Sequence, residues 1–339
     1  MSKQIFKKIL IMCHSNIGDV CYDLVVIDPL RRQFPDAGIF VLTSLRAACV
    51  AEGYKDLEKV IIFDKHAKDR NFLGRLRLVT SLIRERFDLV IVLKSSLMYK
   101  FLCIPHSWSL KKYLGCSPAE AGIHGADTYL AFLRSHGVEA KQAIFNFVLD
   151  KTEEDFCNTF FKEKDIDKEG KLVGILPLAG WSLKSWPIDR CNKLATLLKE
   201  KYGIKTIALG DIEDSVFKEL ILPHISDDLI FAGKTTLKQA IALLKCCDVF
   251  IAPDSGLSHL ASTMGIKTIG LYGPTPKNYI YPYFHQQDMI FPRKKLECMP
   301  CYPELTHCIC KERGDLLSDC MKGISVEDVL DSVKRNLEL

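Results

Sequence analysis

The sequence predicts two α/β domains in tandem, each built on a doubly wound parallel sheet with helices on both faces. The chain has 339 residues, whereas single hydrophobic cores stop growing at about 250–300 residues. Hydrophobic residues make up 48% and charged residues 26% of the chain, an ordinary globular composition. Short apolar runs alternate with longer amphipathic segments along the chain, and this alternation is typical of βαβ units.

The first series of elements belongs to the N-terminal domain. We expect strands at 8–12, 38–43, 60–63 and 89–93, with helices at 19–34 and 71–86. The first of these helices ends before Pro35, which cannot continue a helix. A charged amphipathic helix, 153–167, follows, and we place the domain boundary at its end. The expected domains are therefore 1–165 and 166–339.

The second series repeats the same alternation. We expect strands at 172–176, 206–209, 229–231, 249–252 and 268–272, and helices at 189–202, 214–220, 234–245, 257–264 and 325–337. Ser325 is the expected N-cap of the last helix, with Asp328 three residues on. This last segment, 325–339, is a candidate to pack back on the N-terminal domain.

Charge is distributed unevenly along the chain. Residues 1–150 carry 21 Lys and Arg against 15 Asp and Glu, a net charge of +6, and the remainder carries 25 against 27, a net charge of −2. A basic N-terminal half suits an anionic partner. The alternative is an ordinary solvated surface, since Arg75-Leu76-Arg77 and Arg84-Glu85-Arg86 resemble the outer face of an amphipathic helix.

The loop after the first expected strand opens the first expected helix. Gly18 is its only glycine, so the loop lacks the G-x-G-x-x-G fingerprint of dinucleotide-binding folds. Gly18 would let another molecule approach the backbone closely. Asp19 lies near the helix N-terminus, where the dipole favours its ionised form. Two interpretations of Asp19 stay open: a general base at the cleft or an N-cap carboxylate.

The loop at 176–187 follows the first strand of the second domain. Its small residues, a hydroxyl and a lysine suit phosphate binding. Lys184 would act as a point charge, with Ser182 and backbone N–H groups as donors. The alternative is an ordinary loop with a surface lysine.

A third loop follows a very apolar strand and enters a helix. The N–H groups of Ser255, Gly256 and Leu257 would face a diphosphate at the helix N-terminus. Asp254 would accept hydrogen bonds from sugar hydroxyls. His259 lies inside the helix, where we expect it to support this donor loop rather than to catalyse.

An acidic loop, 210–214, follows a further strand of the same domain. Glu213 or a neighbouring acidic residue would bind a ribose hydroxyl pair. A helix N-cap by Asp211 or Asp214 is the competing interpretation.

Taken together, these motifs resemble the heptosyltransferases of glycosyltransferase family 9 over nearly the whole chain. The resemblance rests first on Gly18-Asp19, followed at family spacing by RRQFPDA at 31–37, and on Lys184 with Trp186-Pro187. It rests most specifically on DSGLSH at 254–259 together with GLYGPT at 270–275.

The resemblance implies a GT-B fold, in which two Rossmann-like domains face a central cleft. The acceptor would bind the N-terminal domain and the donor the C-terminal domain. It implies an inverting, metal-independent transfer of heptose from ADP-heptose to a lipopolysaccharide core. Asp19 matches the catalytic base and Lys184 the lysine on the donor phosphate. The remaining matches are donor contacts: Asp254, the amides of Ser255 and Gly256, and, approximately, Glu213 on the ribose.

Three departures from the family pattern bear on substrate identity. Leu24-Val25 stands where many members carry Thr-Pro, and Asp23 and Asp28 lie in a helix that is usually less acidic. Ala179 and Gly180 replace hydroxyl residues of the phosphate loop. The chemistry is nevertheless coherent. Lys184 and a helix N-terminus would neutralise the charge that builds on the leaving diphosphate. A carboxylate would take the proton of the attacking hydroxyl, and attack from the opposite face would invert the anomeric centre.

Fourteen cysteines are present, and five of them cluster near the C-terminus. The five are Cys298, Cys301, Cys308, Cys310 and Cys320. Their spacing favours a structural zinc site, whereas their odd number and the absence of a family role favour free thiols. No cofactor is required for the expected chemistry.

The expected partners are ADP-heptose or a similar nucleotide-sugar and an anionic lipopolysaccharide core at the inner membrane surface, with no nucleic acid. Residues 1–12 are expected to form a strand rather than a signal peptide. Together with the scattered free thiols, this predicts a cytoplasmic protein. A peripheral position on the inner face of the inner membrane is compatible with that prediction.

Three rival interpretations remain. One is a GT-B enzyme that uses another nucleotide-sugar, including an epimerase, which would need acid and base residues on the donor side. A second is a dehydrogenase, which the missing glycine fingerprint disfavours. The third is a non-catalytic nucleotide- or carbohydrate-binding paralogue, against which the joint presence of Asp19, Lys184 and Asp254 argues.

Overall fold

The structure is a computed structural model that describes residues 5–114, 122–210, 215, 219, 221–233, 235–302 and 307–339. The chain divides into two compact units, which meet between Val148 and Leu149. This boundary lies before the one expected at residue 165. Helix α8 (Lys151–Glu163) belongs to the second unit because it packs on helix α10 (Leu237–Lys245) and buries Phe160 and Phe161 in that unit's core.

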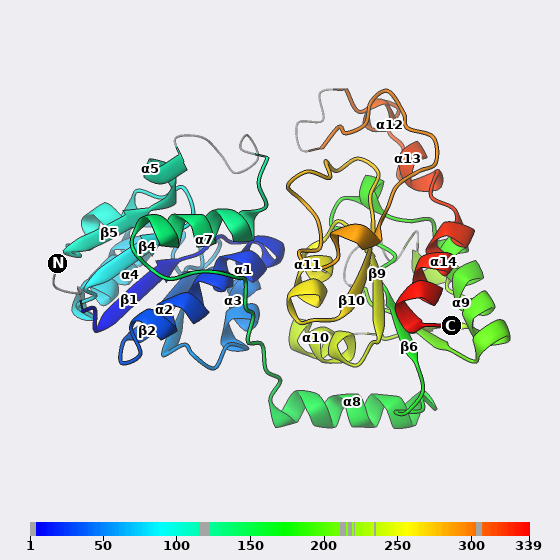
Figure 1. The fold of residues 1–339 in the computed structure, drawn as a ribbon, viewed down its shortest axis with the longest axis horizontal. Coiled ribbons are helices and arrows are strands. Elements are labelled where there is room, and N and C mark those ends of the chain that lie inside the picture. The colour runs from blue at the N-terminus through cyan, green and yellow to red at the C-terminus, as the bar shows by residue number, and fades with distance from the viewer. Residues whose placement is uncertain are drawn as a thin grey trace. The chain divides into compact units, whose positions relative to one another are not determined.

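The N-terminal unit contains a five-stranded parallel sheet in the order β3-β2-β1-β4-β5 (Figure 1). Its strands are β1 (Lys8–Met12), β2 (Gly38–Thr43), β3 (Lys59–Ile62), β4 (Leu89–Val92) and β5 (His106–Ser109). Four of the five were expected within one residue. Strand β5 was missed because its sequence, HSWS, lacks an apolar run and half of it is exposed.

The helices of this unit depart further from expectation. They are α1 (Ile17–Asp23), α2 (Ile27–Gln33), α3 (Leu45–Glu52), α4 (Phe72–Arg84), α5 (Leu110–Leu114) and α7 (Gly125–Ser135), with 3-10 turns η1 (Leu24–Val26) and η2 (Met98–Phe101). The single helix expected at 19–34 is interrupted by η1. Pro29 explains the interruption, because it has no N–H to donate to the carbonyl of Val25 and its ring clashes there.

The C-terminal unit contains a six-stranded parallel sheet in the order β11-β10-β9-β6-β7-β8. Its strands are β6 (Leu172–Ile175), β7 (Lys205–Ala208), β8 (Leu229–Phe231), β9 (Val249–Pro253), β10 (Lys267–Leu271) and β11 (Met289–Ile290). Five of these match the expected strands, and the two-residue β11 was not expected. Two separate apolar clusters cover the two faces of this sheet, one holding Val173 and Ile175 and the other Leu172.

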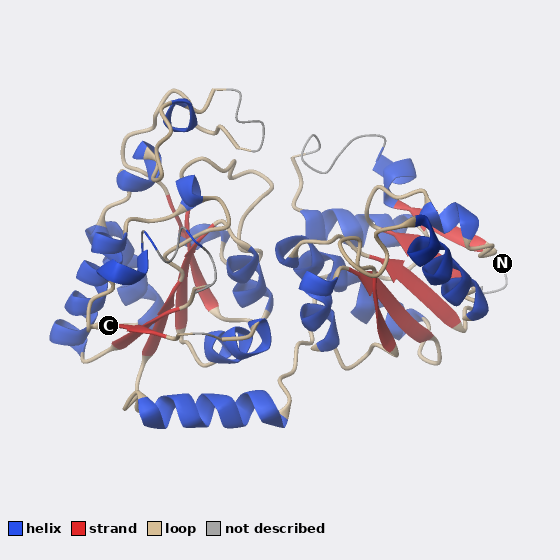
Figure 2. Cartoon of the chain, turned by 180° about the vertical axis from the view of Figure 1, so that it is seen from behind, coloured by secondary structure: helices blue, strands red, loops and turns tan. Residues whose placement is uncertain are grey.

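The helices of this unit pack around its own sheet, as Figure 2 shows from behind. Besides α8 and α10 they are α9 (Ile188–Tyr202), α11 (Gly256–Thr263), α12 (Ile309–Glu312), α13 (Asp319–Lys322) and α14 (Val326–Leu337), with short turns η3 (Ser182–Lys184), η5 (Leu222–His224) and η6 (Gln286–Asp288). The helix expected at 214–220 falls mostly outside the described residues.

The last helix packs on elements of its own unit, and the expectation that it also packs back on the N-terminal domain stays a prediction. Helix α14 contacts α9, β9 and β10, and it contributes Val326, Val329 and Val333 to the C-terminal core. Its expected N-cap is confirmed, since the Ser325 hydroxyl accepts a hydrogen bond from the Asp328 N–H at 3.2 Å.

Both sheets reverse their strand order at one point, between β1 and β4 in the first unit and between β6 and β9 in the second. In open α/β sheets, ligands bind beyond the carboxyl ends of the strands at such a switch point. The loops after β1, β4, β6 and β9 are therefore where functional side chains are expected. Among the described residues, no helix is both long and apolar enough to cross a bilayer.

Candidate functional site

The switch point of the C-terminal sheet holds a buried ion pair. Lys184 lies in η3, in the loop after β6, and Asp254 lies at the end of β9. The Lys184 Nζ is 2.5 Å from the Asp254 Oδ2, and each side chain is only 8% exposed. Strand pairing of β6 with β9 brings these residues together across 70 positions of the chain.

Asp254 has two further partners. The His259 Nε2 lies 3.0 Å from its Oδ1, and the Thr275 hydroxyl donates to its Oδ2 at 3.0 Å. Burial by itself would raise the pKa of Asp254, but its hydrogen bond with His259 and the charges of His259 and Lys184 outweigh burial and lower that pKa below its usual range. Asp254 is therefore an ionised anchor for the residues around it, and His259 supports the loop, in line with the sequence-based expectation.

An aromatic ring covers the other side of Lys184. The Lys184 Nζ lies 3.3 Å from the centroid of the Tyr302 ring, a cation–π contact. The Tyr302 N–H donates to the Pro274 carbonyl at 3.1 Å, and its ring lies 5.9 Å from that of Trp181. The ammonium group is thus held between a carboxylate and a ring.

The N-terminus of α11 carries a capping box. The Ser258 N–H donates to the Ser255 hydroxyl at 3.3 Å, and the Ser255 N–H donates to the Ser258 hydroxyl at 3.2 Å. This corrects the expectation that the Ser255 N–H is free for a diphosphate. The first-turn amides of Gly256 and Leu257 have no carbonyl one turn earlier within the helix to receive them, so they remain the donors suited to an anion.

The structure gives less information on two other residues that were predicted to contact the sugar donor, Ser182 and Glu213. Ser182 begins η3 and is half-buried, two residues before Lys184. Glu213 lies outside the described residues.

In the N-terminal unit, Asp19 lies in the first turn of α1 and is exposed. The Asn16 side-chain amide donates to its Oδ2 at 3.0 Å. The N-cap position of α1 is Asn16, and its side chain makes no capping bond. Asp19 is therefore not the cap of this helix, and its carboxylate faces solvent. Gly18, half-buried, precedes it in the same turn.

A second carboxylate lies one turn further along this helix. Asp23 is fully buried, and its Oδ2 accepts from the His14 N–H at 2.6 Å while its Oδ1 lies 2.9 Å from the His14 Nδ1. Burial by itself would lower the pKa of His14, but the charge and hydrogen bond of Asp23, with a smaller contribution from Asp19, raise it to about 9. His14 is thus a cation at neutral pH, close to Asp19.

The ends of β2 and β4 complete this edge of the sheet. The Thr43 hydroxyl donates to the His14 carbonyl at 2.8 Å, and the Ser44 hydroxyl donates to the Ser15 carbonyl at 2.6 Å, so the loop after β1 is fixed by β2. Lys94 follows β4, and burial lowers its pKa. Parallel pairing of β1 with β4 places Lys94 at the same edge as His14.

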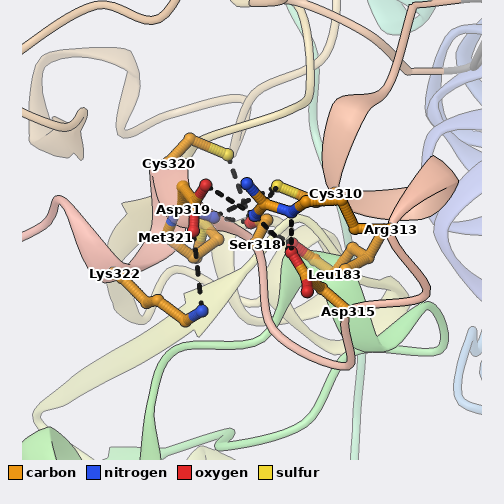
Figure 3. Close-up of polar contacts among 9 residues, drawn as sticks. All are labelled: Leu183, Cys310, Arg313, Asp315, Ser318, Asp319, Cys320, Met321 and Lys322. Carbon is orange, nitrogen blue, oxygen red and sulfur yellow. Dashed lines mark hydrogen bonds and ion pairs between the residues drawn. The ribbon is translucent and has the colours of Figure 1, made fainter.

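The cysteine-rich segment, residues 298–320, contacts the turn that carries Lys184: the Ser318 hydroxyl donates to the Leu183 carbonyl at 2.6 Å (Figure 3). Burial first, and then the neighbouring thiol of Cys308, raise the pKa of Cys301 to about 12. Cys310 has different neighbours, since the Arg313 guanidinium lies 3.7 Å from its sulfur and also pairs with Asp319.

In the described part of the chain, one group has three metal-ligand atoms within 4.8 Å of one another: Cys310, Asp315 and Asp319. The Arg313 guanidinium already bonds to both carboxylates of that group. A structural zinc held by the five clustered cysteines stays a prediction.

Sequence reasoning missed several residues of these sites. His14, Lys94, Thr275 and Tyr302 had not been assigned roles. His14 and Lys94 lie just after β1 and β4, and Thr275 lies in the GLYGPT motif just after β10. Their position at the carboxyl edge of a strand was therefore the signal that could have identified them. Tyr302 gave no such signal, because it lies among the cysteines and reaches Lys184 only through tertiary structure.

These features can now be set beside known proteins. A family model for glycosyltransferase family 9 (heptosyltransferase) matches residues 75–310. The chain belongs to this family and is a glycosyltransferase.

Curated proteins that are similar to this chain are named heptosyltransferases. The lipopolysaccharide core heptosyltransferase OpsX of Haemophilus influenzae is 25% identical over 285 residues, which cover 78% of this chain and 79% of that protein. Lipooligosaccharide heptosyltransferase 2 of Campylobacter jejuni is 25% identical over 343 residues and covers 98% of both chains.

Solved structures show the fold. A family 9 glycosyltransferase from Veillonella parvula superposes with a TM-score of 0.81 at 21% identity, covering 98% of this chain and 97% of that one. The ADP-heptose lipopolysaccharide heptosyltransferase II of Escherichia coli gives a TM-score of 0.73 at 20% identity, with 98% of both chains covered. The two parallel-sheet α/β domains are those of the GT-B fold, as the sequence predicted.

Proposed function

We propose that this glycosyltransferase transfers heptose from ADP-heptose to a sugar of a lipopolysaccharide core. The names of the two curated relatives support the sugar and the acceptor, and the alignment with the Campylobacter protein spans 98% of both chains. The solved Escherichia coli protein is named an ADP-heptose lipopolysaccharide heptosyltransferase, which supports ADP-heptose as the donor.

The observation that carries the proposal is the Lys184–Asp254–His259 arrangement at the switch point of the C-terminal sheet. The donor diphosphate would lie at the N-terminus of α11, where the amides of Gly256 and Leu257 and the helix dipole favour an anion. Lys184 would add its charge, held in place by Asp254.

In this proposal, Asp254 mainly holds Lys184 in place and has little remaining capacity to bind the sugar directly. Its Oδ2 already accepts from Lys184 and Thr275, which occupy the two lone pairs of that oxygen. Its Oδ1 has one partner, His259, and so retains one acceptor site for a donor hydroxyl. Ser182 would add a hydroxyl donor to the phosphate, and Glu213 would bind the ribose.

In the reaction, the acceptor hydroxyl oxygen attacks the anomeric carbon from the face opposite the diphosphate. The bond between that carbon and the β-phosphate oxygen breaks, and its electron pair leaves with ADP. Asp19 takes the hydroxyl proton, for which its exposed carboxylate in the first turn of α1 is suited. Lys184 and the α11 N-terminus stabilise the leaving charge, so the mechanism needs no metal ion.

The N-terminal switch point suits an anionic acceptor. His14 is held protonated by Asp23, and Lys94 follows the neighbouring strand β4. Two cations beside the base would attract the acidic groups of a lipopolysaccharide core and orient a hydroxyl toward Asp19.

The test is a transfer assay with purified protein, ADP-heptose and a set of lipopolysaccharides truncated before each core heptose. Mass spectrometry should show one acceptor extended by a single heptose, with release of ADP. Nuclear magnetic resonance of the product should show inverted anomeric configuration. Transfer from a different nucleotide-sugar, with none from ADP-heptose on any acceptor, would refute the proposed donor.

A further inference from the structure

Helix α4 has two apolar stripes, and only one of them is used inside the protein. Gly74, Leu78 and Leu82 are buried, and Leu78 and Leu82 pack in the core cluster on one face of the N-terminal sheet. Phe72 and Leu76 belong to a second stripe on another side of the helix and stay exposed.

The second stripe follows helical periodicity. Phe72, Leu76 and Ile83 are exposed and spaced i, i+4 and i+11, a repeat that places side chains on one face. Val79, at i+7, lies at the edge of this stripe and is half-buried against the core cluster. Phe72 is 77% exposed and the adjacent Leu73 is 61% exposed. A solvent-facing helix surface is ordinarily polar, so this stripe is suited to contact with another apolar phase.

The charges around this stripe have one sign. Residues 65–84 contain six Lys and Arg residues and one acidic residue, Asp69. Asp69 is 2% exposed, and its carboxylate accepts from the Asp64 N–H. The six cations are all exposed, and within the described part of the chain no ion pair forms among or to them. They are Lys65, Lys68, Arg70, Arg75, Arg77 and Arg84.

On a helical wheel, Arg75 lies on one side of the exposed apolar stripe, and Arg77 and Arg84 lie on the other. Long basic side chains placed this way extend to lipid headgroups while the apolar stripe enters the interface. The 13 residues of α4 make a helix of about 20 Å, long enough to lie along a membrane surface.

The neighbouring segment extends the same surface. Turn η2 packs Met98 and Tyr99 against the same apolar cluster that holds Leu78 and Leu82 of α4, so both segments cover the same face of the N-terminal sheet. Leu97 and Phe101 on this segment are exposed, and Lys100 beside them is exposed and basic.

We propose that α4, together with residues 65–71 and 97–101, docks the N-terminal unit on a bilayer that contains anionic lipids. Phe72, Leu73 and Leu76 insert at the headgroup boundary, and the flanking cations bind phosphate groups. A second copy of this chain is a poorer occupant, because a symmetric interface would bring twelve uncompensated cations together.

The proposal is tested by vesicle co-sedimentation of the full chain without donor or acceptor. Vesicles of phosphatidylethanolamine with phosphatidylglycerol are compared with vesicles of phosphatidylcholine alone. The parent should bind the anionic vesicles and should lose binding as salt is raised. F72S/L73S should weaken binding roughly tenfold or more, since two large apolar side chains no longer enter the interface. Each of R75Q and R77Q should weaken it about fivefold.

Matched controls lie in the C-terminal unit. L316S/L339S changes two exposed leucines, and R335Q removes one exposed cation. Both should bind anionic vesicles as the parent does. Unchanged melting temperatures would show that the α4 variants fold, as expected because Phe72 and Leu73 are exposed.

Three results would overturn the proposal: no binding of the parent, equal binding to both kinds of vesicle, or binding that F72S/L73S leaves unchanged. A change of sedimentation coefficient confined to the α4 variants, without vesicle binding, would instead assign this face to a contact between proteins. The assay contains no sugar donor, so its failure would leave the proposed transferase reaction untouched. F72S/L73S should retain turnover on a water-soluble acceptor.

Discussion

Each unit has an aspartate near the carboxyl edge of its parallel sheet, but the two aspartates differ in exposure and in the number of their hydrogen-bond partners. In the N-terminal unit, Asp19 is exposed, and the side-chain amide of Asn16 donates a hydrogen bond to its carboxylate. In the C-terminal unit, Asp254 is 9% exposed and is bonded to Lys184, His259 and Thr275. Both loops lie at the switch point of their sheet, but on opposite sides of it: Asp19 follows β1, the first strand of its unit, whereas Asp254 follows β9, which pairs with the first strand β6 across the switch point.

This difference shows how one architecture supports two chemical tasks. A carboxylate bound by several donors holds its neighbours in place but is a weak proton acceptor, because its charge is already stabilised. A solvent-facing carboxylate with one amide partner keeps lone pairs available for a proton. The N-terminal unit also has its own anchored carboxylate, Asp23, which holds His14. Under the proposed mechanism, anchoring and proton transfer therefore belong to separate residues.

The largest expected effect is on turnover in Asp19→Asn. If Asp19 is the base, the rate should fall by roughly 10²- to 10⁴-fold, while donor affinity stays near that of the parent because the proposed donor site lies in the other unit. Turnover, ADP affinity by calorimetry and melting temperature should be measured on one preparation. Near-normal turnover would place the base elsewhere.

Asp254→Asn should act mainly on stability and donor binding. Removing one partner from a buried ion pair costs about 3–5 kcal/mol, because Lys184 is left buried without its counter-charge. Urea unfolding of the C-terminal unit would measure this cost. Glu327→Gln is the matched control, since its pair with Lys193 is about 60% exposed on both sides; solvent screens this pair, so its loss should cost much less. Equal losses in the two variants would contradict the anchoring role.

Lys184→Ala should weaken ADP binding by about 1.5–3 kcal/mol, the value of one charge-assisted contact. Asp254 keeps His259 and Thr275 in this variant, so the fold should suffer less than in Asp254→Asn. Calorimetry well below the melting temperature separates affinity from stability, and Lys193→Ala serves as the control. An unchanged dissociation constant would count against a phosphate role for Lys184.

A smaller effect is expected from pH at the His14–Asp23 pair. The pKa of His14 is raised from 6.5 to about 9. The stability that this shift contributes is therefore fully present below about pH 6.5 and is lost as pH rises through about 9. The ring is one-third exposed, so the loss should be on the order of 1 kcal/mol. Melting temperatures between these limits should fall further in the parent than in His14→Gln, and parallel curves would contradict the assignment.

The smallest expected effect is that of chelation. Because Lys184 and the α11 N-terminus carry the stabilising charge, turnover should not change when EDTA is added just before the assay. Prolonged incubation should be followed separately by melting temperature, which would reveal slow loss of a structural zinc from the cysteine-rich segment. Lost turnover that Mg²⁺ or Mn²⁺ restores at once would refute the metal-independent mechanism.

Local patterns in the sequence were sufficient to predict most strands, one helix cap and the positions of the functional loops. Apolar runs such as 8–12 and 38–43 predicted strands at their observed positions. The Ser325 cap followed from a hydroxyl placed before a periodic segment. The loops after strands were found in the same way, because parallel sheets gather functional loops at one edge. The family was also recognisable, since its motifs are short and lie in those loops.

Tertiary structure alone decided which of these residues meet. Lys184 and Asp254 were predicted to bind the donor separately, yet they bind each other because β6 pairs with β9. Tyr302 reaches Lys184 from the cysteine-rich segment, and Ser258 occupies the Ser255 amide. Periodicity reports the type of an element and the direction of its buried face. It does not report strand order, which depends on long-range packing, and strand order determines which loops become neighbours and which helix face, as on α4, stays in solvent.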